Sequence, residues 1–297
     1  MEPKTNRVKV KDLIKISQLC DIFALWLCGF GFLCNLIVEK IGNEQPGKIK
    51  PMTNNCLHCQ EQTMGKFCSN CSQPTATHRF SITHVFKHDF IHGIFHLDNG
   101  FFYTIKELFT RPGHSVREYI QGKRVKHFNY FATIILLLTI GYFLKKWTII
   151  DASELYDQTT VGGLFKVLKN YSKVAVFLHI PIIAFASYVL FRKSNQNYAE
   201  NLVLNLYLLC GVLTISFVLP LVMIFSGDKT FLLWINYYLT ILTFAYIIIF
   251  YYQYFSVFGL KKYKLIIRVI IVAAIYLATK QLTNNLLNIV GLKYLNH

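Results

Sequence analysis

Residues 202–225 read LVLNLYLLCGVLTISFVLPLVMIF, an apolar run without a single charged side chain. A helix needs about 20 apolar residues to cross the roughly 30 Å of hydrocarbon in a bilayer. Lipid offers no hydrogen-bond partner to an open backbone, so such a run can cross the membrane only as a helix. The run therefore predicts a transmembrane helix and decides the fold class.

Four more apolar runs lie in the second half of the chain. They cover residues 128–144, 174–191, 231–258 and 265–279. A buried helix of a soluble protein explains any one of these runs, but five in succession favour a membrane protein. We therefore predict an all-α membrane protein with a bundle of about five transmembrane helices over residues 128–297.

The composition agrees with this fold class. Hydrophobic residues make up 54% of the 297 residues and charged residues 15%, whereas soluble domains average about 25% charged residues. The net charge of +16 suits a nucleic-acid binder or a membrane protein with basic cytoplasmic flanks. The basic residues gather beside the apolar runs, so we expect the lipid bilayer as a partner and no nucleic acid.

Residues 1–51 form an N-terminal extension that allows two interpretations. Residues 20–38 have spanning length after a basic stretch, which predicts a signal-anchor helix and a sixth span. The basic stretch before this run would place the N-terminus in the cytoplasm, and a single crossing would then place the basic residues before Phe128 outside. This conflicts with the preference of Lys and Arg for the cytoplasmic side. If the run belongs to the protein, it is therefore re-entrant or lies on the membrane surface. The other hypothesis is that translation starts at Met52 and that residues 1–51 do not belong to the native protein.

Residues 52–75 contain two closely spaced cysteine pairs, Cys56-x2-Cys59 and Cys68-x2-Cys71. Each pair can place two thiolates on one side of a tight turn, and two such turns complete a tetrahedral Zn²⁺ site. Two disulfides are the alternative, which a cytoplasmic location disfavours. Iron fits the same four sulfurs. We predict a zinc ribbon whose closed ligand shell is structural and not catalytic.

Residues 76–127 form an amphipathic, basic connector with two candidate sites. One is a stripe of histidines at every fourth position: His84, His88, His92 and His96. The stripe fits an amphipathic helix on the bilayer surface, or the metal site of a membrane-bound metalloenzyme. The other is a basic group that fits an anionic lipid or a flank that orients the chain: Arg111, Arg117, Lys123 and Arg124.

Ionisable residues are scarce inside the predicted spans. His179 lies mid-run, two residues before Pro181, where a kinked helix would expose it to a cavity. Such a residue favours a transporter or channel-like bundle, but the runs contain none of the buried acids that ion coupling uses. They also contain no G-x-S-x-G or H-E-x-x-H motif, so we do not expect an enzyme.

The cysteine motif and the connector together resemble a known family. The segments CLHC (56–59), GKFCSNCSQ (65–73) and GFFYTIKELFTRPGHSVREYIQGKRVKHFNYF (100–131) are similar to domain-of-unknown-function family 3667, an uncharacterised bacterial family. The resemblance implies an N-terminal zinc ribbon joined to a multi-pass membrane domain, with the four cysteines above as ligands. Ser72 departs from the pattern, because Gly commonly follows the last cysteine. The family has no established activity.

These observations lead to one functional hypothesis and two alternatives. We expect a multi-pass protein of the bacterial inner membrane with a cytoplasmic ribbon that serves an interaction or scaffolding role for a cytoplasmic protein. A small-solute transporter and a membrane-bound metalloenzyme that uses the histidine stripe are the alternatives.

Overall fold

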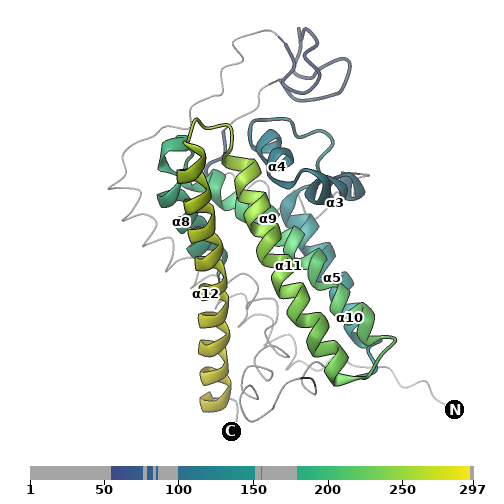
Figure 1. Cartoon of the computed structure of the whole chain (residues 1–297). Coiled ribbons are helices and arrows are strands. Elements are labelled where there is room, and N and C mark those ends of the chain that lie inside the picture. Colours follow the sequence, from purple (N-terminus) through teal and green to yellow (C-terminus); the bar gives the residue numbers. More distant parts are fainter. Residues whose placement is uncertain are drawn as a thin grey trace, which may run out of the picture. The chain divides into compact units, whose positions relative to one another are not determined.

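A computed structural model describes residues 55–75, 79–82, 85, 100–150, 155 and 179–294 (Figure 1). Within these residues the secondary structure is helical and contains no strand. Extended pairing there is limited to two isolated antiparallel bridges in the cysteine motif, Asn55 with Gln62 and Phe67 with Pro74. The prediction of a helical protein is confirmed at this level.

The structure describes eight α-helices. They are α3 (Gly100–Thr110), α4 (Pro112–Ile120), α5 (Tyr130–Lys146), α8 (Ile180–Leu190), α9 (Tyr198–Ser216), α10 (Val218–Met223), α11 (Lys229–Phe255) and α12 (Lys262–Tyr294), with a short 3-10 turn, η2 (Arg192–Ser194), after α8. Residues 151–154 and 156–178, between α5 and α8, lie outside the described residues.

Polar side chains determine where the long helices begin. The side chain of Asn129 accepts a hydrogen bond from the backbone N–H of Phe131 (2.8 Å), and Asp228 caps α11 in the same way. At the start of α9, Asn197 and Glu200 each accept a hydrogen bond from the other's backbone N–H, at 2.8 and 2.9 Å. Such caps satisfy N–H groups that a helix start leaves without partners.

Three helical segments of the described residues are long and apolar enough to cross a membrane. They are Tyr198–Met223, Lys229–Phe255 and Lys262–Thr283, and they correspond to the predicted runs 202–225, 231–258 and 265–279. The first segment contains both α9 and α10, which separate just before Pro220. Pro220 has no N–H to continue the helical hydrogen-bond ladder, which explains the break.

The other two predicted spans are not confirmed. Residues 128–144 form α5, whose 17 residues reach about 26 Å, short of the hydrocarbon thickness. Residues 174–191 are described from His179 onward, and α8 there has 11 residues. His179 is the N-cap of α8 and Pro181 lies in its first turn, a position that proline tolerates. Residues 174–178 lie outside the described residues, so the expectation of His179 beside a kink stays a prediction.

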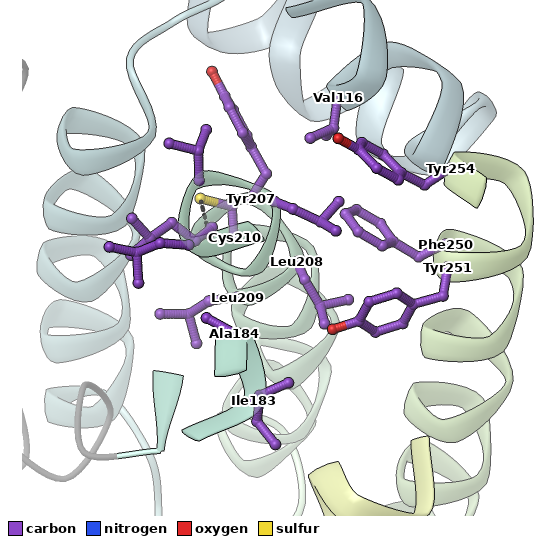
Figure 2. Packing of buried hydrophobic residues seen from close by; sticks show 14 of the residues in the cluster. Val116, Ile183, Ala184, Tyr207, Leu208, Leu209, Cys210, Phe250, Tyr251 and Tyr254 are labelled. Atoms are coloured by element: carbon purple, nitrogen blue, oxygen red, sulfur yellow. Dashed lines mark hydrogen bonds between the residues drawn. The ribbon is translucent and has the colours of Figure 1, made fainter. Parts of the chain in front are cut away.

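Helix α9 lies at the centre of the packing. Every residue from Ala199 to Gly211 is buried, and α9 contacts α8, α5, α11 and α4. Figure 2 shows side chains of α4, α8 and α11 directed toward α9, among them Val116, Ile183 and Phe250. Helix α9 is therefore the element around which α4, α5, α8 and α11 pack.

A buried hydrogen-bond network joins three of these helices. The side-chain amide of Asn205 on α9 donates to Ser187 Oγ on α8 (3.2 Å), and its carbonyl oxygen accepts from the hydroxyl of Tyr251 on α11 (2.6 Å). Ser187 also donates to Asn201 Oδ1 (3.0 Å). Because buried polar groups are costly unless they are hydrogen-bonded, this network fixes which faces of the helices meet.

The long helices alternate in direction, which brings several of their termini to one end of the bundle. At this end Phe191, after α8, stacks on Phe255, the last residue of α11, with 3.8 Å between ring centroids. Gln196, before α9, donates to the hydroxyl of Tyr254 (2.5 Å). We call this the basic end, for the charges described below; it also holds the starts of α5 and α12.

Candidate metal centre and basic end of the bundle

The four cysteines of the predicted ribbon lie together. The Sγ atoms of Cys56 and Cys71 are 3.5 Å apart, as are those of Cys59 and Cys68, and all four Sγ atoms lie within 4.8 Å of one another. A disulfide would need about 2.05 Å, and all four are free thiols. Tetrahedral coordination at about 2.3 Å per bond requires sulfurs about 3.8 Å apart, so the arrangement can bind a metal ion.

Two matching turns bring the sulfurs together. In the first, Gln60 N–H donates to Cys56 O (2.9 Å) and Cys56 N–H donates to Glu61 O (2.7 Å). In the second, Ser72 N–H donates to Cys68 O and Cys68 N–H donates to the carbonyl of Gln73, each at 2.9 Å. Gln60 and Ser72 have positive φ angles of 65° and 58°. The departure at Ser72 therefore falls on a left-handed residue, the conformation that favours glycine.

The thiols of the second pair differ in acidity. Backbone N–H groups of Cys71 and Asn70 stabilise the thiolate of Cys68 and lower its pKa to about 7. Burial raises the pKa of Cys71 to about 12. Because a metal binds the thiolate, metal binding must release the proton of Cys71, and the affinity depends on pH.

Gln73 attaches the cysteine motif to the connector. Its side-chain Nε2 donates to Gly122 O (3.0 Å), and its Oε1 accepts from Arg124 N–H (3.3 Å). The Gln73 side chain is buried, and Gly122 has a positive φ of 112° that keeps the turn tight. Gln73 could not be predicted from the sequence because both of its partners are backbone groups, which carry no sequence signal.

The basic residues of the connector mainly contact the protein itself. Arg111 pairs with Glu107 (2.7 Å) and Glu118 (3.3 Å). The guanidinium of Arg124 lies 4.0 Å from the ring centroid of Phe80, a cation–π contact. The expectation that Arg111, Arg117, Lys123 and Arg124 bind an anionic lipid stays a prediction.

Arg117 and Gly113 attach α4 to the last turn of α11. Nη1 of Arg117 donates to the carbonyl oxygens of Gln253 (2.8 Å) and Tyr254 (3.2 Å). Both carbonyls lie in the last turn of α11, where Gln253 O also accepts from Ser256 Oγ (3.0 Å), and a cation there complements the helix dipole. Gly113 N–H donates to Gln253 Oε1 (3.2 Å), and a Cβ at Gly113 would overlap the backbone of α11 at Phe250.

His127 lies between aromatic rings just before α5. Its ring centroid is 5.3 Å from that of Tyr103 and 5.6 Å from that of Tyr119. Burial lowers the pKa of His127 to about 4, although the carboxylates of Glu107 and Glu118 act in the opposite direction. His127 is therefore neutral at pH 7.

Positive charge gathers at the basic end. The described Lys and Arg residues at this end are Arg79, Arg111, Arg117, Lys123, Arg124, Lys126, Arg192, Lys193, Lys261, Lys262 and Lys264. Those toward the opposite end are Lys145, Lys146, Lys229, Lys280 and Lys293. The sequence alone indicated only a modest bias of Lys and Arg toward one side of the membrane. Only the fold shows which distant segments lie at the same end of the bundle.

Two large apolar side chains of the cysteine motif face solvent. Met64 is fully exposed and the side chain of Phe67 is 63% exposed. They lie on either side of Gly65 and Lys66, in the loop between the two cysteine pairs.

Some predicted sites fall outside the described residues. These are residues 1–51 and the histidine stripe, His84, His88, His92 and His96.

The comparisons with known proteins concern the connector and α5. Residues 98–140 match the family model described as a protein of unknown function (DUF3667). This segment is similar to that family. The match confirms the predicted resemblance, and it covers less than half of the chain. No curated protein and no solved structure matched the chain. The DUF3667 segment holds α3, α4 and the start of α5, and thus Gly113, Arg117 and the Gly122 turn; the cysteine motif precedes it.

Proposed function

We propose that this chain is a multi-pass protein of the bacterial inner membrane that holds a zinc ribbon at the cytoplasmic face, where the ribbon binds a protein partner. The gathering of Lys and Arg at one end of the bundle carries the proposal. Lys and Arg flank membrane spans mainly on the cytoplasmic side. The ribbon attaches at that same end, through Gln73 and the Gly122 turn.

Five crossings are part of the proposal. Besides the three long segments, α5 leads away from the basic end and α8 leads back to it, so the five helices alternate in direction. The alternating directions support a bundle of five crossings. In this bundle α5 and α8 would each cross the membrane together with residues that adjoin the helix. With the basic end inside, the chain after α12 lies outside.

Zinc is the metal we propose for the four thiolates. Four sulfurs in a tetrahedral shell suit Zn²⁺ and leave no open position for a substrate or water, so the ion would stabilise the two turns without a catalytic role. A unit this small has little core of its own, and metal binding would supply much of its folding free energy.

Metal analysis of the purified full-length protein tests the ribbon. We expect one equivalent of zinc, lost in Cys56→Ser and Cys71→Ser and kept in Cys210→Ser, whose thiol lies buried in α9. Less than half an equivalent in the wild-type protein, or equal loss in all three variants, would contradict the proposal.

The exposed residues Met64 and Phe67 support a protein partner for the ribbon. A photo-crosslinking amino acid at Phe67 should capture a defined protein in native membranes, and the same group at Trp147, exposed near the opposite end, should not. Binding of the purified partner should weaken at least tenfold in Met64→Glu. Unchanged binding in Met64→Glu and Phe67→Glu would overturn this function. Within the described residues no observation favours the transporter or the metalloenzyme.

A further inference from the structure

We infer that α3 is a membrane-inserted interfacial helix that places Phe102 and Phe109 among the acyl chains of the cytoplasmic leaflet. The partner of this surface is the lipid bilayer. The inference rests on the proposed membrane orientation, and it assigns to α3, within the DUF3667 segment, a role that neither its charge nor its length suggests.

The outer face of α3 has the composition that lipid contact requires. Phe102 is 81% exposed and Phe109 47% exposed, while Thr104 and Leu108 are buried against the bundle. Residues four and seven apart share one face of a helix, so exposed Lys106 lies between the two rings. A lysine at this position can extend its amine toward the phosphates while its methylene groups stay in the apolar layer.

Two contacts determine the depth of α3. The hydroxyl of Tyr246 on α11 donates to Leu108 O (3.1 Å), and the rings of Phe109 and Tyr246 are 6.0 Å apart. Tyr246 lies about 13 Å along the helix axis from Phe255, the end of α11. The middle of α3 is held by the segment just before α5, where Phe128 N–H donates to Thr104 Oγ1 (2.7 Å).

The depth of α3 in the bilayer follows from the length of α11 and the position of Tyr246 along it. Its 27 residues extend about 40 Å, and the hydrocarbon is about 30 Å thick, so each end projects by about 5 Å. Leu108 then lies about 8 Å inside the hydrocarbon boundary. Interfacial amphipathic helices bury their apolar face to about 5–10 Å. In Figure 1, α3 runs across the direction of α11, as an interfacial helix does.

We assign lipid as the partner of α3 because its exposed surface adjoins the exposed apolar surface of α11, a candidate membrane span. Leu242 and Ile249, one turn to either side of Tyr246 on α11, are 52% and 49% exposed. These side chains belong to a candidate membrane span and have no other cover within the described residues. Phe109 contacts Tyr246 between them, so the apolar surface of α11 continues onto Phe109 of α3, with Lys106 lying beyond it before Phe102.

Photolabelling of the full-length protein in liposomes tests the inference. A lipid with a photoreactive group in its acyl chain should label Phe102 and Phe109 within about twofold of Leu242 and Ile249. Met64 is even more exposed than Phe102 but lies on the ribbon, so it should take less than a tenth of that label. Replacement of both rings, Phe102→Ser with Phe109→Ser, should abolish labelling of α3 and leave α11 labelled.

The outcomes separate this inference from the proposed function. Labelled α11 with unlabelled α3 would overturn the inference alone, and would indicate that protein or water covers Phe102. Absence of label from both α3 and α11 would overturn the membrane assignment itself. Equal labelling of Met64 and Phe102 would also contradict the inference, since the label would then report exposure and not depth.

Discussion

Gln60 and Ser72 each follow the second cysteine of a pair and adopt the left-handed backbone conformation, which costs a residue with a Cβ about 1–2 kcal/mol. Glycine avoids this cost but loses more entropy on folding. We expect Ser72→Gly to stabilise the metal-bound ribbon by about 0.5–1 kcal/mol. A competing chelator should then be needed at roughly threefold higher concentration to remove the metal.

Ser69 provides the matched control for this prediction. It lies within the same turn but does not have a positive φ. Ser69→Gly should therefore leave the chelator midpoint unchanged or lower it. A midpoint raised equally by both substitutions would show that the left-handed backbone at Ser72 is not the cause.

His127 gives the protein a pH-dependent stability. Its pKa is about 4 in the folded protein, against 6.5 for an ordinary histidine. The neutral ring therefore stabilises the fold fully above about pH 6.5, and this contribution is lost as the pH falls toward 4. The loss amounts to at most about 3 kcal/mol.

Unfolding in detergent between pH 7.5 and 4.5 measures this effect. The stability of His127→Gln should depend less on pH than that of the wild-type protein. His58→Gln removes a less buried histidine whose pKa is also lowered by burial, and it should have the smaller effect. Identical pH profiles for wild type and His127→Gln would refute the assignment.

At the scale of single residues, the sequence predicts a site when its side chains lie at a characteristic spacing along the chain. The cysteines could be placed together because two residues between thiols fix a tight turn, and the structure brings their sulfurs within 4.8 Å. Gln73 and His127 could not be found in this way. Their roles depend on backbone and ring partners that only the folded connector supplies.

The contact between α4 and α11 depends on the absence of a side chain at Gly113. A Cβ there would overlap backbone atoms of Phe250 and Tyr254, which cannot move like a flexible side chain. We expect Gly113→Ala to destabilise the protein by about 2–3 kcal/mol in thermal unfolding. Gly65→Ala, whose nearest atom lies 3.8 Å away, should change the stability by less than about 0.5 kcal/mol.

Arg117 stabilises the end of α11 as an element. Arg117→Gln removes charge-assisted hydrogen bonds to two terminal carbonyls and should cost about 1–3 kcal/mol. Hydrogen exchange should increase first in the last turn of α11, around Tyr252–Ser256. Lys123→Gln is the charge-matched control and should leave that exchange unchanged; faster exchange in both variants would indicate a general effect of charge.

Apolar length predicts elements well where a run is long, and less well where it is short. The runs at 202–225, 231–258 and 265–279 match helices because each has few charges over a spanning length. The α5 run ends at Lys145 and Lys146, and the helix formed there stays short. Pro181 could equally begin or kink a helix by sequence, and the structure places it in the first turn of α8.

For the whole molecule, the distribution of charge predicts the orientation. Fluorescent protein inserted at Asn195 or Gly259, both at the basic end, should be cytoplasmic and fluoresce. Alkaline phosphatase inserted at Gly227, at the opposite end, should be exported and active. The reverse pattern would contradict the cytoplasmic ribbon. The sequence contains each basic residue, but which of them share an end depends on the alternating helix directions.

Helix α9 combines two properties that rarely coincide. The segment Tyr198–Met223 has the highest mean hydropathy of the three candidate spans, 2.3 against 1.8 and 1.9, yet it is also the most enclosed by protein. High hydropathy would favour entry of this segment into a bilayer before α11 and α12 have been synthesised. Ser187 of α8, which precedes α9 in the chain, can already bind Asn201 and Asn205 at that stage. The hydrogen bond from Tyr251 to Asn205 can form only after α11 has followed.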